Sequence, residues 1–241
     1  MDQDSIKRLY DQSYARTYND KFLTSYLTTA DAVFEVQLLG NLLTPGARWL
    51  DLACGTGHFL SHFPDYERAG LDLSPAMLEE ARQANPGTPF HEGSYLTERS
   101  EWHDHWDLVS CMWYAYGLVD SVRELETLVG NMARWTSPRG SCFVPLSDPT
   151  LITGHNIPFH QPGCPFPGEV TITGIIWSYS EDHGSKVHAH QIAPNVEFME
   201  SLFLRHFANV RLVSYPPSPP NFTVARRALI ASQKRPTSAL A

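Results

Sequence analysis

Two glycines and one aspartate carry the clearest chemical signal in the sequence. Gly55 and Gly57 follow the apolar run at 49–53, and glycine lets a chain turn tightly and lets a ligand reach main-chain N–H groups without obstruction by a Cβ atom. Asp72 ends the next apolar run, where a carboxylate can accept hydrogen bonds from both hydroxyls of a ribose. Together the three residues predict a nucleoside site.

The third glycine of the dinucleotide-binding fingerprint is missing, because Leu60 stands in its place. A pyrophosphate needs the close approach of a helix N-terminus, whereas a ligand without phosphate does not. Two alternatives stay open on these residues alone. One is a glycine turn in a flavodoxin-like fold that binds no nucleoside, and the other is a nicotinamide or flavin dinucleotide site.

The segments LDLACGTGHF at 50–59 and GLDLSPAMLEEAR at 70–82 resemble the first two motifs of class I S-adenosylmethionine-dependent methyltransferases. The resemblance covers 45–147 well, and the order of elements up to 232 is similar to the family's, in which a reversed last strand joins the sheet. It implies S-adenosyl-L-methionine as the cofactor. It also implies methyl transfer by in-line displacement to a small-molecule acceptor of secondary metabolism.

The same resemblance assigns roles to residues of the expected site. Residues 53–57 wrap the methionine part of the cofactor, Asp72 holds its ribose, and Leu73 and Met77 flank its adenine. Family members often place an aspartate after the third strand to bind the adenine amino group, but Ser94 stands there in this chain. The cofactor-binding residues expected in all are Tyr14, Tyr18, Asp51, Ala53, Gly55, Gly57, Asp72, Leu73, Met77, Ser94, Tyr95 and Cys111.

Acceptor-binding and catalytic candidates follow the fourth and fifth expected strands. The aromatic residues of 111–117 can line the mouth of a substrate pocket and attract a sulfonium or ammonium, or they simply pack the next helix. For a general base we expect His155 or His160, on a proline-rich loop predicted to be a mobile lid at 148–168, with Tyr114 as an alternative.

Two further clusters have an open interpretation. Tyr10, Tyr14 and Tyr18 recur every four residues and form either a helix that closes over the cofactor or a plain core stripe. On a strand, His188 and His190 would share a face, which makes a metal site geometrically feasible. No metal-ligand motif appears, so we predict no metal.

Apolar spacing predicts the elements that position these residues. Helices are expected at 4–18, 20–43, 58–63, 75–84, 121–136 and 195–207. Strands are expected at 48–53, 68–73, 89–92, 106–112, 141–147, 169–179, 186–193, 209–215 and 223–232. This alternation favours an α/β fold with a doubly wound, Rossmann-like methyltransferase sheet, N-terminal helices and an inserted β cap.

We expect a single methyltransferase domain over 1–241. Its parts are N-terminal helices at 1–44, a cofactor-binding core at 45–147, an inserted cap at 148–193, and a C-terminal helix and strands at 194–233.

The composition restricts the partners. A net charge of −8 argues against nucleic acid, since nucleic-acid affinity depends on clustered Lys and Arg. No signal peptide or membrane span is recognisable, so we expect a cytoplasmic protein, monomer or homodimer, with reduced cysteines. The alternative to methyl transfer is a protein that binds S-adenosylmethionine without methylating, either a pericyclase-like enzyme or an activating partner.

Overall fold

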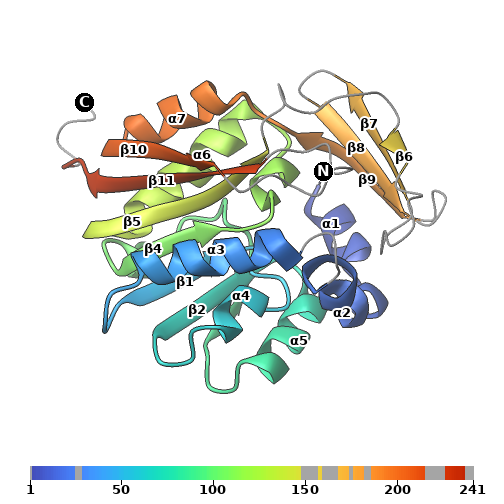
Figure 1. The fold of residues 1–241 in the computed structure, drawn as a ribbon, viewed down its shortest axis with the longest axis horizontal. Helices are drawn as coiled ribbons and strands as arrows, with labels where there is room; N and C mark the ends of the chain where they lie inside the picture. The colour runs from blue at the N-terminus through green and yellow to red at the C-terminus, as the bar shows by residue number, and fades with distance from the viewer. Residues whose placement is uncertain are drawn as a thin grey trace.

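The computed structural model describes residues 2–24, 29–147, 157–158, 168–173, 176–181, 186–214 and 226–236. Its main feature is a seven-stranded sheet with the strand order β10-β11-β5-β4-β1-β2-β3 (Figure 1). The strands span Arg48–Leu52 (β1), Glu67–Asp72 (β2), Phe90–Glu92 (β3), Trp106–Cys111 (β4), Thr136–Ser147 (β5), Phe207–Ser214 (β10) and Arg226–Lys234 (β11).

All strand pairs of this sheet are parallel except the two that involve β11, the last strand in the chain. β1 pairs in parallel with β2 and β4, β2 with β3, and β4 with β5. β11 runs antiparallel to both β5 and β10. The predicted doubly wound α/β sheet with a reversed last strand is therefore confirmed, and the carboxyl ends of β1, β2 and β4 meet at one edge, where ligands bind in such folds.

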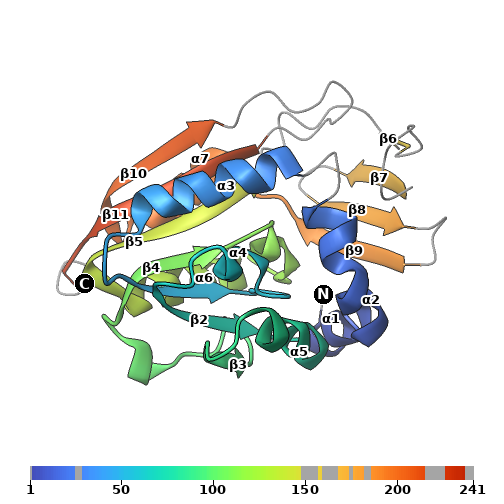
Figure 2. The same ribbon diagram turned by 60° about the horizontal axis from the view of Figure 1, so that its bottom comes forward.

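Helices cover both faces of the sheet because side chains alternate along each strand. Leu50 and Leu52 pack into a core with α6 and α7, whereas Trp49 packs into a second core with α3, α4 and α5. Figure 2 shows α3 and α6 on opposite faces. The helices of these two layers span Thr29–Leu42 (α3), His58–Ser61 (α4), Pro75–Ala84 (α5), Val122–Trp135 (α6) and Val196–Leu204 (α7).

The N-terminal segment is more broken than the predicted helices at 4–18 and 20–43. Asp11 interrupts the first, because its carboxylate accepts from the Tyr14 N–H at 2.9 Å and caps a new helix. The elements are α1 (Gln3–Leu9), α2 (Gln12–Tyr18) and a π-helix, η1 (Asn19–Leu23), before α3. Two 3-10 turns follow later in the chain, η2 (Ser100–Trp102) and η3 (Ala115–Leu118).

A second sheet lies between β5 and α7 in the chain and beside α1 and α2 in space (Figure 1). It is antiparallel, with the order β6-β7-β8-β9, and its strands span Ile157–Pro158, Gly168–Thr173, Ile176–Glu181 and Lys186–Ile192. The single strand predicted at 169–179 was wrong, since β7 and β8 pair as a hairpin. The lone Gly174 in an apolar run gave too weak a turn signal.

Among the described residues, no helix has the length and apolar character needed to cross a membrane.

Candidate functional site

The glycine turn after β1 has a left-handed backbone at Ala53, Gly55 and Gly57, with φ of +50°, +55° and +69°. A Cβ on Gly57 would lie 2.7 Å from Asn85 Nδ2 and 3.2 Å from Ala81 Cβ, so Gly57 lets the turn pack closely against α5. A Cβ on Gly55 would meet only Met77 Cε, at 3.8 Å. The backbone at Gly55 is therefore the more accessible part of the turn.

Asp72, at the end of β2, holds this turn through its carboxylate. Oδ2 accepts from the Gly55 N–H at 2.8 Å, and Oδ1 accepts from the Ser74 N–H at 2.8 Å. Burial raises the pKa of Asp72, and the hydrogen bonds from Ser74 and Gly55 oppose that shift. Each carboxylate oxygen keeps a further lone pair, so the group can still accept from a ligand.

Asp51, in β1, is a buried carboxylate with a spare acceptor. Its Oδ1 accepts from Ser110 Oγ at 2.6 Å, and Ser110 Oγ accepts in turn from Trp49 Nε1 at 2.8 Å. Asp51 Oδ2 has no hydrogen-bond partner among the described residues. Burial raises the pKa of Asp51 to about 7, and the nearby Asp72 and Glu35 carboxylates contribute to the shift. A cationic donor from a ligand would satisfy this oxygen.

The residues expected around the adenine lie on α5 and on the loops that follow β2 and β3. Met77 is buried on α5, and Leu73 is partly exposed at the end of β2. Ser94 Oγ accepts from the Leu96 N–H at 3.1 Å, so its hydroxyl shapes its own turn. The Tyr95 hydroxyl donates to the Ala115 carbonyl at 3.0 Å and thereby connects the loop after β3 to the loop after β4.

The loop after β4 contains a contact that the sequence analysis missed. Cys111 is buried at the end of the strand, and Trp113 and Tyr114 follow with left-handed φ values of +49° and +61°. Trp113 Nε1 donates to Glu35 Oε2 at 2.8 Å, although Glu35 belongs to α3 and is fully buried. A signal was present, since Glu35 is an acid between the apolar Phe34 and Val36.

The N-terminal tyrosines form one aromatic stack. Tyr14 packs against Tyr10 and Tyr18 with ring centroids 5.6 and 5.9 Å apart, and Tyr18 packs against Phe22 at 5.1 Å. The Tyr14 hydroxyl lies 3.2 Å from His188 Nε2 in β9. The predicted stripe therefore exists, and it packs against the second sheet.

The same segment is also bonded to the glycine turn and its neighbourhood. Thr56 Oγ1 donates to Asn19 Oδ1 at 2.5 Å, and Ser74 Oγ donates to the Tyr10 carbonyl at 2.6 Å. The N-terminal helices thus contact both the expected cofactor turn and the second sheet.

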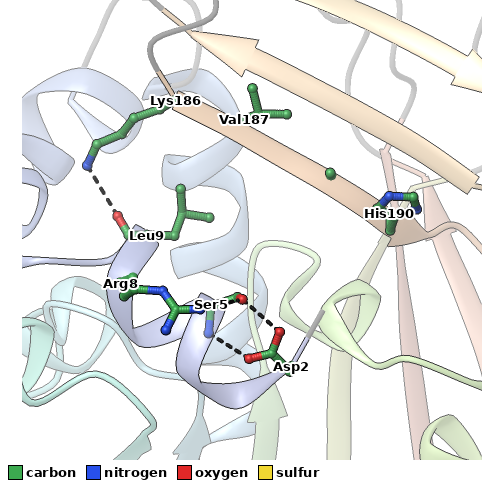
Figure 3. A pocket seen from close by; sticks show the side chains of 8 residues that line it. Asp2, Ser5, Arg8, Leu9, Lys186, Val187 and His190 are labelled. Atoms are coloured by element: carbon green, nitrogen blue, oxygen red, sulfur yellow. Dashed lines mark hydrogen bonds between the residues drawn. The ribbon is translucent and has the colours of Figure 1, made fainter.

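A pocket opens between α1 and β9 (Figure 3). Its lining carries both signs of charge: Lys186 Nζ donates to the Leu9 carbonyl at 3.2 Å, and the Asp2 carboxylate accepts from Ser5. Its lining residues are Asp2, Ser5, Arg8, Leu9, Lys186, Val187, Ala189 and His190. Of the expected cofactor-binding and catalytic residues that the structure describes, none lines it.

The histidines of the cap do not form the shared face considered for a metal site. The pairing of β9 shifts between Trp177 and Tyr179, and His190 has a φ of +57°, so a bulge breaks the alternation. His188 is consequently buried and His190 exposed. Within the described part of the chain, no group of three metal-ligating side chains occurs. The base candidates His155 and His160 lie outside the described residues, as does most of the predicted lid at 148–168.

The charge around the second sheet is also informative. No Lys or Arg occurs between Arg139 and Lys186, whereas four acidic residues do: Asp148, Glu169, Glu181 and Asp182. Residues 140–185 thus offer an anionic ligand no Lys or Arg, although Lys186 of β9 and Arg8 line the pocket described above.

Comparison with known proteins supports a methyltransferase assignment. Residues 50–140 match the family model described as "Methyltransferase domain". A dTDP-4-amino-2,3,4,6-tetradeoxy-D-glucose N,N-dimethyltransferase of Saccharopolyspora spinosa is 34% identical over 46% of this chain and 45% of its own length. A trans-aconitate 2-methyltransferase of Acidovorax is 43% identical over 23% of each chain. The chain thus spans about half the length, or less, of these curated relatives.

A solved structure shares the whole architecture. The S-adenosylmethionine-bound amino pentose methyltransferase from Micromonospora echinaspora aligns with a TM-score of 0.62 at 21% identity, over 93% of this chain and 98% of that one. Residues 50–140 therefore match a methyltransferase domain in sequence. The chain as a whole has the fold of the S-adenosylmethionine-dependent methyltransferases.

Proposed function

We propose that the protein transfers the methyl group of S-adenosyl-L-methionine to an amino group of a small molecule, of the amino-sugar type. The observation that carries the proposal is the glycine turn joined to Asp72 by the Gly55 N–H, beside a buried Asp51 with a spare oxygen. This arrangement lies within the segment that matches methyltransferase domains.

The residues fit the chemistry of this cofactor. The backbone of 53–57 would hold the methionine part, Asp72 would accept from the ribose hydroxyls, and Asp51 Oδ2 would accept from the cofactor's ammonium group. Tyr14, Tyr18, Leu73, Met77, Ser94, Tyr95 and Cys111 complete the proposed set. When bound, the cofactor supplies a methyl group on a sulfonium, which is already a strong electrophile.

The protein's own contribution is alignment and control of a proton. An acceptor bound as its ammonium would first lose one proton to a base. The lone pair of the resulting neutral amine would then form the new N–C bond while the methyl–sulfur bond breaks and its electron pair stays on sulfur, so that the cofactor would leave as S-adenosylhomocysteine and the product as a methylammonium. His155, His160 and Tyr114 stay the proposed candidates for that base.

An amine is favoured over a carboxylate acceptor by charge. The buried acids Glu35 and Asp51 and the partly buried Asp72 interact electrostatically at the sheet edge, and 140–185 contains no Lys or Arg. A tricarboxylate such as trans-aconitate, the acceptor named for one relative, would lack counter-charges there. The amino group of a dTDP-amino sugar, the acceptor named for another relative, would be attracted as its ammonium form, whereas the diphosphate of that sugar would have to lie away from these acids.

We further propose one methyltransferase domain over 1–241, with the cap at 148–193, acting in the cytoplasm as a monomer or homodimer and binding no nucleic acid. The net charge of −8 supports the last point.

The proposal is tested by incubating the protein with methyl-labelled S-adenosylmethionine and either dTDP-4-amino-2,3,4,6-tetradeoxy-D-glucose or trans-aconitate. Label in the amino sugar supports the proposal, and Asp72→Ala should abolish it. Label in trans-aconitate alone would exclude an amine acceptor, whereas cofactor binding without label in either would favour a non-methylating protein.

The base is tested separately with His155→Gln and His160→Gln. Replacement of the residue that serves as the base should reduce turnover about 10²–10⁴-fold. Cofactor affinity should stay the same, because a base acts on the acceptor. Normal turnover in both variants and in the double variant would exclude both histidines.

A further inference from the structure

We propose that Glu35 and Trp113 together form a binding surface for a cationic amine, with the Glu35 carboxylate at the N–H edge of the indole ring and the ring face toward the ligand. The inference rests on the proposed function and extends it, because it identifies the residues that select an amino group rather than a hydroxyl.

The first observation is a buried charge on a helix that otherwise packs the core. Glu35 has no solvent exposure, and α3 contributes Ala32 and Leu39 to one of the two hydrophobic cores. Burying a carboxylate costs free energy unless another group stabilises its charge. A core helix has no packing need for such a residue, so its presence indicates a ligand-related role.

The second observation is where the Glu35 side chain reaches. Its Oε2 accepts from Trp113 Nε1 at 2.8 Å, and Trp113 lies two residues beyond the end of β4. That position is the ligand edge of the sheet, next to the strand that carries Asp51. Glu35 therefore places negative charge at the ligand edge although it comes from a buried helix.

The third observation is the backbone of the loop. Trp113 and Tyr114 are consecutive non-glycine residues with left-handed φ values. Such conformations are strained, and they persist where surrounding contacts hold a side chain in a required position. The hydrogen bond to Glu35 is such a contact, and it fixes the orientation of the indole ring.

The chemistry of this pair suits an ammonium ion. The face of an indole ring attracts cations more strongly than that of any other side chain, and the attraction grows in sites shielded from water. Donation of the indole N–H to a carboxylate increases the electron density of the ring. Trp113 is partly buried. An amine carries positive charge before deprotonation and after methyl transfer, whereas a hydroxyl acceptor carries none.

The test uses the full chain saturated with S-adenosylhomocysteine and two probes of similar shape, tetramethylammonium and neutral tert-butanol. The indole N–H resonances of the six tryptophans are recorded by NMR, and the signal missing in Trp113→Phe identifies Trp113. We expect tetramethylammonium to shift the Trp113 signal and to bind about 10-fold more tightly than tert-butanol.

The variants separate charge from packing. Glu35→Gln keeps an acceptor for the indole N–H but removes the charge, and it should weaken tetramethylammonium binding about 3- to 10-fold without changing S-adenosylhomocysteine affinity. Glu79→Gln removes an equal charge from an exposed position on α5 and serves as the matched control. Trp113→Leu, which removes the ring and leaves Glu35 in place, should abolish the preference for the cation.

Equal binding of the two probes, or unchanged tetramethylammonium affinity in both Glu35→Gln and Trp113→Leu, would overturn the inference. If Glu35→Gln does not fold, the Trp113 variants decide. The outcome is independent of turnover: labelled methyl transfer to an amino sugar with no probe preference would leave the proposed function intact and exclude only the Glu35–Trp113 surface.

Discussion

The two sides of the ligand edge are held together in different ways. Around the glycine turn, the main contacts join a carboxylate to backbone N–H groups of the same βαβ unit, as Asp72 does to Gly55 and Ser74. On the other side, to which α2 and α3 contribute and which we call the N-terminal side, side chains meet across long separations, 78 residues for Glu35 and Trp113 and 174 for Tyr14 and His188. Substitutions that strain the backbone should therefore have the larger effect around the glycine turn. Substitutions that remove a single polar contact should have the larger effect on the N-terminal side.

The largest effect is expected within the glycine turn. Gly57→Ala should lower the free energy of unfolding by about 3 kcal/mol, because a left-handed alanine costs about 1–2 kcal/mol and the Cβ would overlap Asn85 and Ala81. Gly55→Ala should cost only about 1–2 kcal/mol, since its Cβ meets no close neighbour. Urea unfolding of both variants measures the difference, and equal losses would mean that packing against α5 is not what requires Gly57.

Replacement of Asp72 is expected to reduce the binding free energy of S-adenosylmethionine by a comparable amount. Asp72→Ala should weaken S-adenosylmethionine binding by about 2–4 kcal/mol, since it removes the ribose acceptor and leaves the Gly55 and Ser74 N–H groups without their partner. Calorimetry gives the affinity, and a urea titration shows whether the turn itself is weakened. Binding within twofold of the parent would place the nucleoside elsewhere.

The difference between the two sides also explains what the sequence could predict. The strands of the seven-stranded sheet, its doubly wound order and the common site of Gly55 and Asp72 follow from local patterns, namely apolar runs, glycine and helix caps such as Ser74 on Met77 N–H. The contact between Glu35 and Trp113 could not be predicted, because the two residues belong to different elements. Helical periodicity does not indicate which loop of the sheet a buried acid on a helix contacts. The bulge that separates His188 from His190 likewise depends on pairing with β8, which no local pattern specifies.

A smaller effect, about tenfold, is expected from the pKa of Asp51. Its raised pKa of about 7 means that the carboxyl is largely protonated at pH 6 and ionised at pH 8. Because an ammonium binds the ionised form, S-adenosylmethionine affinity should rise about tenfold from pH 6 to pH 8. Asp51→Asn should remove this dependence. A flat affinity profile in the parent would show that Asp51 does not bind the cofactor's ammonium group.

The smallest effect is expected where the N-terminal helices meet the second sheet. The Tyr14 hydroxyl and His188 Nε2 lie 3.2 Å apart in a buried setting, with Lys186 Nζ 3.8 Å above the Tyr14 ring. Tyr14→Phe keeps the ring stack and the cation–π contact and removes only the hydrogen bond, so it should cost about 1 kcal/mol of unfolding free energy. His188→Asn should cost more unfolding free energy, since it also removes a ring that packs against Tyr10.

A double-mutant cycle of Tyr14→Phe and His188→Asn isolates the interaction between the two side chains, and we expect a coupling energy of about 0.5–1.5 kcal/mol. A coupling energy near zero would mean that ring packing alone holds α2 against β9, and the N-terminal side would then depend less on single polar contacts than the Glu35–Trp113 hydrogen bond suggests.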